Sequence, residues 1–131
     1  MLPPGSQGRI VSRWVDAFNA RDLEAMLADL AADVDFRPLR LSGIAASYRG
    51  QDGVREWFAQ LTELRHEHRI ALHEARELAE GRVFAAGSLS LAGVSDLGPF
   101  WALYRFDGEL IVAAAQYLTD PDMVEPLGLI R

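Results

Sequence analysis

Residues 99–118 read PFWALYRFDGELIVAAAQYL, two apolar and aromatic runs separated by Asp107-Gly108. Asp and Gly tolerate the positive φ angles of a tight turn, and aromatic residues favour strands. The stretch therefore predicts a β-hairpin, with one strand over residues 99–106 and a second over residues 109–118. Residues 111–115 are Ile-Val-Ala-Ala-Ala and do not alternate with polar residues, so we expect both faces of the second strand to be covered.

Two further strands precede this hairpin in the sequence. Residues 82–92 are rich in apolar side chains, and residues 68–78 alternate irregularly between apolar and charged ones. Glu80-Gly81 is a turn signal between these two runs, and residues 93–98 form a second turn region. Four consecutive strands joined by short turns predict an antiparallel meander.

The N-terminal half carries the helical periodicity. Apolar residues recur at helical spacing over residues 9–19, from residue 23 to a helix end near residues 31–33, and over residues 51–64. Asp22 is placed to cap the second helix, because its carboxylate can accept a hydrogen bond from the next turn. Short extended pieces are expected at residues 34–37 and 46–49.

Three helices followed by a strand meander predict an α+β fold, with three N-terminal helices packed on a curved, mostly antiparallel sheet. We expect one such domain over residues 9–131, after a flexible leader over residues 1–8. The length of 131 residues and the 50% hydrophobic and 24% charged composition are typical of one globular domain.

Charge and composition exclude several classes of function. The net charge is -6 and no basic patch is visible, which argues against a nucleic-acid partner. The chain has no cysteine, which excludes disulfides, thiolate metal sites and cysteine nucleophiles and favours a cytoplasmic location. No apolar run is long enough to span a membrane, and the first six residues do not resemble a signal peptide.

Four stretches of the sequence carry a resemblance to a known family. They are RWVDAFNARDL at residues 13–23, LAADVDF at 30–36, YRGQDGVREWF at 48–58 and YRFDGELI at 104–111. In this order and spacing they resemble the SnoaL-like branch of the nuclear transport factor two-like superfamily, over about residues 9–120. The resemblance implies a cone-shaped fold with a small apolar pocket between the helices and the concave face of the sheet. It also implies a small apolar ligand and a homodimer formed through the convex face.

The superfamily includes ketosteroid isomerases, limonene epoxide hydrolases, scytalone dehydratases and polyketide cyclases, so the resemblance does not choose a reaction. A ketosteroid isomerase needs a carboxylate base, a phenol and a protonated acid. The base would fall here on Arg37 or Pro38, the phenol on Trp14 and the protonated acid on Ala102. None of these residues has the required chemistry. The cyclase acid falls on Gln116, which orients a substrate but takes no proton at neutral pH.

An epoxide hydrolase would use an arginine and a carboxylate, and Arg105 and Asp107 have a suitable spacing. The turn itself accounts for Asp107, because Asp favours tight turns for backbone reasons. The spacing therefore gives no support for epoxide chemistry.

Four residues remain as candidates for catalytic roles, and each has a structural alternative. Arg37 can clamp a ligand carboxylate or pair with Asp35 on the surface. Tyr48 can donate a hydrogen bond to a ligand carbonyl or pack at the rim of the core. His73 can shuttle protons near neutral pH or lie exposed on its strand, and Gln116 can orient a ligand.

Several apolar residues are expected to line the pocket, with Trp101 on the other face of the sheet, towards a partner subunit. The expected lining residues are Trp14, Phe18, Phe36, Trp57, Phe58, Ala102 and Tyr104.

No metal site or cofactor is predicted. His66 and His68 alternate with charged residues and are expected in a solvated loop, while His73 has the opposite strand parity.

Two functions remain open: a small-molecule binding domain able to act as an isomerase, cyclase or dehydratase, or a non-catalytic dimeric ligand-binding or accessory module. A buried titratable group in the pocket, for which His73 and Asp35 are the candidates, would favour the enzyme.

Overall fold

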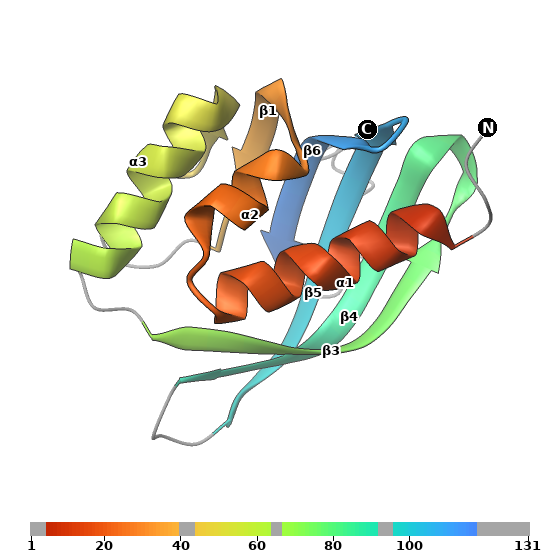
Figure 1. The fold of residues 1–131 in the computed structure, drawn as a ribbon. Helices are drawn as coiled ribbons and strands as arrows, with labels where there is room; N and C mark the ends of the chain where they lie inside the picture. Colours follow the sequence, from red (N-terminus) through yellow and green to blue (C-terminus); the bar gives the residue numbers. More distant parts are fainter. Residues whose placement is uncertain (1–4, 40–43, 64–66, 92–95, 118–131) are drawn as a thin grey trace.

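The structure is a computed structural model that describes residues 5–39, 44–63, 67–91 and 96–117. Three helices lie on one face of a six-stranded sheet, which confirms the predicted α+β fold (Figure 1). We call this face of the sheet the helix face and the other the opposite face. The elements are α1 (Ser6–Asn19), α2 (Leu23–Ala28), β1 (Leu30–Arg37), β2 (Tyr48–Arg49), α3 (Gly50–Glu63), β3 (His68–Glu77), the short 3-10 turn η1 (Ala79–Gly81), β4 (Arg82–Leu91), β5 (Asp96–Asp107) and β6 (Leu110–Tyr117).

The strand order in the sheet is β2-β1-β6-β5-β4-β3. Strands β3 to β6 form the predicted antiparallel meander, whereas β1 pairs with β6 in parallel. The register shifts between Leu72 and Glu74 and again between Arg105 and Phe106. Such irregularities bend strands, and β3 curves across the lower part of the sheet in Figure 1.

Helix α1 begins at Ser6, three residues before the predicted start, so residues 6–8 are helical. The reason lies far away in the sequence. The carboxylate of Glu77, at the end of β3, accepts hydrogen bonds from the backbone N–H groups of Gly5, Gln7 and Gly8 at 3.0, 3.0 and 3.1 Å. These bonds, that of Gly8 first, lower the pKa of the Glu77 carboxyl. A residue of β3 thus caps α1.

Strand β1 begins at Leu30, so the predicted helix end near residues 31–33 and the strand start at residue 34 are wrong. Helix α2 ends here because Asp29 bonds to residues outside the helix. Its carboxylate pairs with Arg13 of α1 at 2.5 Å, and its carbonyl accepts from the N–H of Ile111 in β6 at 2.9 Å. The chain therefore joins the sheet directly after α2.

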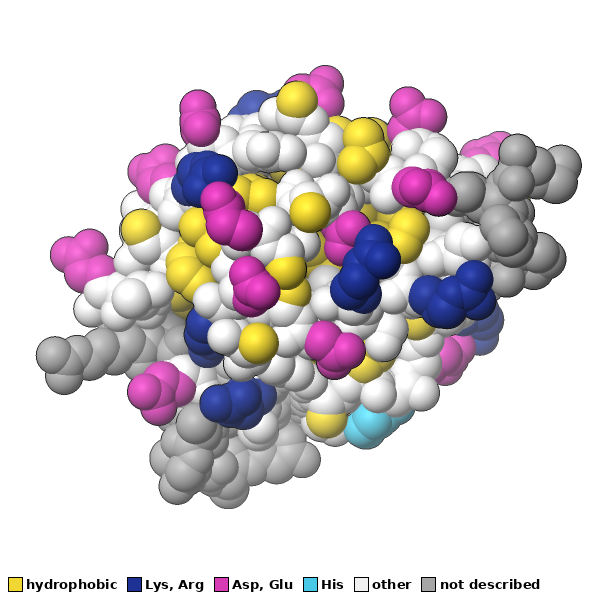
Figure 2. Space-filling view, viewed as in Figure 1, with side chains coloured by type: hydrophobic (Ala, Val, Ile, Leu, Met, Phe, Trp, Pro, Cys, Tyr) yellow, Lys and Arg dark blue, Asp and Glu magenta, His cyan; other side chains and the backbone are white. Residues whose placement is uncertain are grey.

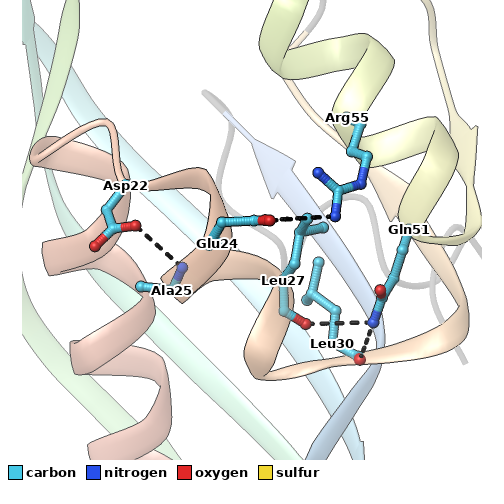
Figure 3. A network of polar contacts seen from close by, with 7 residues as sticks. All are labelled: Asp22, Glu24, Ala25, Leu27, Leu30, Gln51 and Arg55. Carbon is cyan, nitrogen blue, oxygen red and sulfur yellow. Dashed lines mark hydrogen bonds and ion pairs between the residues drawn. The ribbon is translucent and has the colours of Figure 1, made fainter.

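Helix α2 is fixed at both ends, as Figure 3 shows. The predicted cap is confirmed, because the Asp22 carboxylate accepts from the Ala25 N–H at 3.2 Å. At the other end, Nε2 of Gln51 in α3 donates to the carbonyls of Leu27 and Leu30 at 3.3 and 3.0 Å. The same contacts hold α3 beside β1.

The core lies between the helices and the helix face of the sheet. Phe36, Ala114, Tyr104 and Val83 stand in one row across β1, β6, β5 and β4, and all four are buried. Figure 2 shows apolar side chains between the helices and charged ones over the exposed surface.

Strand β6 lies inside the sheet between β1 and β5. Ile111 and Ala113, Ala114 and Ala115 are buried within the single chain, as predicted from the apolar run. Their burial thus requires no second subunit. Among the described residues no helix has the length and apolar character needed to cross a membrane.

Candidate functional site

A cavity lies between the end of α1, the middle of α3 and the helix face of the sheet. It encloses about 310 Å³ of empty space, including the part that opens to solvent. Its walls come from six elements and from the segment that follows β1. The lining residues are Phe18, Pro38, Leu39, Trp57, Leu61, His68, Ile70, Leu89, Phe100 and Gln116.

His68 is the one titratable side chain among these ten lining residues. It is only 8% exposed, so its expected place in a solvated loop is wrong. Strand β3 begins at His68, and the two-residue period of a strand puts its side chain on the same face as buried Ile70. The sequence did indicate this position, because His68 and Ile70 are two residues apart. The charged residues around them, at 65–69, favoured a solvated loop instead.

Gln116 is the second polar residue of the cavity. Its Oε1 accepts a hydrogen bond from the N–H of Leu39 at 3.1 Å. Only the amide oxygen can accept from an N–H group, so this contact fixes the orientation of the amide. The NH₂ group is then the part of Gln116 that can donate to a ligand.

The corner between α1 and α2 holds the strand that carries His68. Asn19 Nδ2 donates to the carbonyl of Ile70 at 2.8 Å, and Asn19 Oδ1 accepts from the Ile70 N–H at 2.9 Å. Arg21, at a φ of 56°, donates to the carbonyl of His68 at 2.8 Å and lies over the Phe18 ring at 4.5 Å. Since β3 is an edge strand, these side chains take the place of a neighbouring strand. They fix three residues of the cavity wall.

An aromatic cluster lies deeper in the cone. Trp14 stacks on Phe18 with ring centroids 6.4 Å apart, and contacts Phe36 and Tyr104 at 6.0 Å each. Trp57 meets the Phe36 ring edge-on at 4.6 Å. Neither Trp14 Nε1 nor the Tyr104 hydroxyl has a hydrogen-bond partner among the described residues. Burial raises the pKa of the Tyr104 phenol, which stays protonated.

Of the residues expected to line the pocket, Phe18 and Trp57 do so. The others occupy the core around it: four are fully buried, and Phe58 is half-buried against the same cluster. The four buried residues are Trp14, Phe36, Ala102 and Tyr104.

Of the four predicted catalytic residues, only Gln116 reaches the cavity. Tyr48 is buried on the helix face, but its hydroxyl accepts from the Ala45 N–H at 2.9 Å and donates to Gln60 Oε1. Both bonds are local to β2 and α3.

Arg37 and His73 lie away from the cavity. Arg37 is on the opposite face, where its guanidinium pairs with Asp35 at 3.2 Å. His73 is exposed at the irregularity of β3, with its Nε2 3.5 Å from the hydroxyl of Ser88. No group of three side chains suited to hold a metal occurs in the described part of the chain.

Comparison with known proteins places this geometry in a family. The model of the SnoaL-like domain matches residues 11–114. No curated protein matches the chain significantly.

Several solved structures resemble the chain over most of its length. An NTF2-like protein of unknown function from Burkholderia pseudomallei K96243 is 24% identical, covers 92% of this chain and 95% of its own, and has a TM-score of 0.73. TerC, co-crystallized with polyporic acid, is 17% identical, with 92% and 96% covered and a TM-score of 0.75. A hypothetical protein with a ketosteroid isomerase-like fold from Catenulispora acidiphila DSM 44928, in complex with trimethylamine, is 21% identical, with 92% and 93% covered and a TM-score of 0.66. At these identities the likeness establishes the shared fold.

Proposed function

The chain belongs to the SnoaL-like domain family, and from this premise we propose that it binds a small, uncharged, mainly apolar molecule in the cavity. The composition of the cavity wall carries the proposal. Eight of the ten lining residues are apolar and the other two are His68 and Gln116. Ligand pockets are typically apolar with a few polar groups that set orientation. None of the described lining residues is Asp, Glu, Lys or Arg, so among them a permanently charged ligand would lose its hydration without gaining a partner.

The size of the cavity limits the ligand. The 310 Å³ includes space that is open to solvent, and the space inside the walls offers room for little more than a water molecule. A larger ligand therefore occupies the open part of the cavity, or enters when lining side chains turn aside. Two proteins of the same fold were crystallised with small molecules, polyporic acid and trimethylamine, which supports the same use of the fold here.

The two polar residues of the cavity indicate that the ligand carries an oxygen atom. The Gln116 amide presents its NH₂ group, since its oxygen is held by Leu39. A carbonyl or hydroxyl oxygen of the ligand is the matching acceptor. His68 lies on the same wall and can exchange a proton with such a group.

A second candidate function is catalysis of a proton transfer, as in isomerisation, cyclisation or dehydration. The observation that favours it is a buried histidine beside nine other described lining residues that carry no charge, the usual setting of a general acid or base. If the protein is instead a non-catalytic ligand-binding or accessory module, His68→Gln should change only the affinity for the ligand.

We expect a thermal-shift screen to identify neutral ligands. The compounds are one- and two-ring ketones, epoxides, polyketide-like aromatics and steroids. A compound that binds only the folded state raises Tm. The Gln116→Leu variant should bind the best ketone about fivefold more weakly, because a hydrogen bond to the ligand is worth about 1 kcal/mol. Each variant is compared with its own ligand-free Tm, since Gln116→Leu also loses the bond to Leu39.

Two variants on surfaces outside the cavity serve as controls for this screen. Arg37→Gln and His73→Gln should keep the affinity of the wild type, because neither side chain reaches the cavity. If either control weakened binding as much as Gln116→Leu did, the ligand would not occupy the cavity.

We also propose a homodimer formed through the opposite face of the sheet. Trp101, Phe84 and Ala86 are half-buried on this face, and no helix of the described chain covers it (Figure 1). Light scattering at micromolar concentration should return twice the chain mass of 14.5 kDa, and Trp101→Glu should return a single chain mass. A monomeric wild type would contradict this assembly.

A further inference from the structure

A ligand with two rings needs one of the lining side chains to move, because the space inside the cavity walls is small. Most of these side chains are held in place. Five belong to strands of the sheet, namely His68, Ile70, Leu89, Phe100 and Gln116. Leu39 is held by its hydrogen bond to Gln116. The Trp57 ring packs edge-on against that of Phe36, with centroids 4.6 Å apart.

Phe18 differs from these residues, because a surface side chain lies over its ring. The Arg21 guanidinium carbon is 4.5 Å from the centroid of the Phe18 ring. The same guanidinium donates to the carbonyl of Phe18 at 3.0 Å and to that of His68 at 2.8 Å. Phe18 is 4% exposed and Arg21 is half-buried, so the guanidinium separates the ring from solvent. Arg21 thus joins the end of α1 to the start of β3 above one cavity residue.

The backbone of Arg21 gives a second reason to assign a role to its side chain. Its φ is 56°, and among the described residues only one other non-glycine residue, Glu80, has a positive φ. A glycine adopts this conformation without strain, whereas an arginine does not. Strained residues of this kind cluster at ligand clamps and other functional sites. What an arginine adds at this corner is the side chain that contacts Phe18 and His68.

We propose that the Phe18 ring is the gate through which a ligand enters the cavity, and that Arg21 holds this gate closed. In the free protein the Phe18 ring stacks on Trp57 at 6.0 Å, where a second ring of the ligand would lie. When the ring turns aside it loses its contact with Arg21, so this contact opposes binding. This inference rests on the proposed function and adds the residues that control entry and ligand size.

Replacing Arg21 with glycine tests the gate, because it removes the guanidinium and suits the positive φ. Arg21→Gly should raise the affinity for 1-indanone, a two-ring ketone, about three- to tenfold, with the gain in kon. Calorimetry measures the affinity. Stopped-flow tryptophan fluorescence measures the rates, since Trp57 lines the cavity. Arg21→Asn repeats the test with a second residue type that tolerates a positive φ.

Asn19→Ala is the matched control for loosening of the cavity wall. Arg21→Gly also removes the bond to the His68 carbonyl, and Asn19 makes two bonds to Ile70 of the same strand. Asn19→Ala therefore weakens the hold on β3 and keeps the guanidinium over the Phe18 ring. This variant should not raise the affinity for 1-indanone. A gain equal to that of Arg21→Gly would assign the effect to the strand and overturn the gate.

A double-mutant cycle shows whether Arg21 acts through Phe18. Phe18→Leu removes the ring and keeps an apolar side chain at the end of α1. In this background Arg21→Gly should change the affinity less than about twofold, because the contact between the two side chains is already lost. The same gain with and without the Phe18 ring would show that Arg21 acts elsewhere, and would overturn the gate.

The remaining outcomes separate the gate from the binding site. If 1-indanone binds the wild type, and Arg21→Gly and Arg21→Asn bind it no faster and no more tightly, the gate is overturned and the cavity remains the ligand site. Failure of 1-indanone to bind the wild type and all variants counts against the proposed function itself, and overturns the gate with it.

Discussion

Replacing Gly87 with alanine is expected to lower the free energy of unfolding by at least about 3 kcal/mol, because the added Cβ has no room. It would lie 2.1 Å from the carbonyl oxygen of Ala71 and 3.1 Å from the Cα of Leu72. These are backbone atoms of β3, so no side chain can rotate to relieve the contact. Strand β3 would have to move, and with it the cavity residues His68 and Ile70.

Gly108→Ala separates this steric effect from the ordinary cost of losing a glycine. Gly108 has a φ of 61° but nothing lies within 4 Å of its added Cβ. Its replacement should cost about 1 kcal/mol from the backbone conformation alone. Urea unfolding of both variants measures the difference. Equal losses would contradict the close approach of β3 and β4.

Trp57→Ala is expected to cost about 3–5 kcal/mol of stability and to impair ligand binding as well. Trp57 is 2% exposed, stacks on Phe18 at 6.0 Å and forms one wall of the cavity. The substitution removes that wall and leaves a void beside the aromatic cluster. We expect the affinity for 1-indanone to fall at least about tenfold, since a fully buried aromatic contact is lost.

Phe58→Ala is the matched control on the same helix. Phe58 is half-buried and does not line the cavity. It should cost less stability than Trp57→Ala and leave the affinity unchanged. Equal losses of affinity in the two variants would show that substitutions in α3 weaken ligand binding by destabilising the fold, and not by removing a wall of the cavity.

Much of the fold could be predicted from local patterns. The Asp107-Gly108 hairpin, the meander and the helical faces each depend on neighbours within a few residues, and each is present. The errors arose where distant residues decide. Glu77 starts α1 from another strand, and Ile111 ends α2 by bonding to Asp29. A sequence read locally contains no sign of either contact.

The site was harder to predict because strand parity decides which side chains face inward. His73 has the opposite parity to His68 and Ile70 and therefore lies outside the cavity that they line, and the extra residue at Leu72–Glu74 reverses the parity of the residues that follow. Arg37 likewise stands on the face away from the helices, beside Asp35. Gln116 was found because the resemblance marked its position on the last strand. The unpaired Tyr104 hydroxyl follows only from three-dimensional packing.

The most direct test of the central claim is to map the binding of 1-indanone on ¹⁵N-labelled protein by amide chemical shifts. The account predicts that the largest shifts cluster around the cavity, at Phe18, Ile70, Leu89, Phe100 and Gln116, and that Arg37 and Arg76 on the opposite face do not move. Shifts confined to the opposite face, or no saturable shifts at all, would contradict a ligand site between the helices and the sheet.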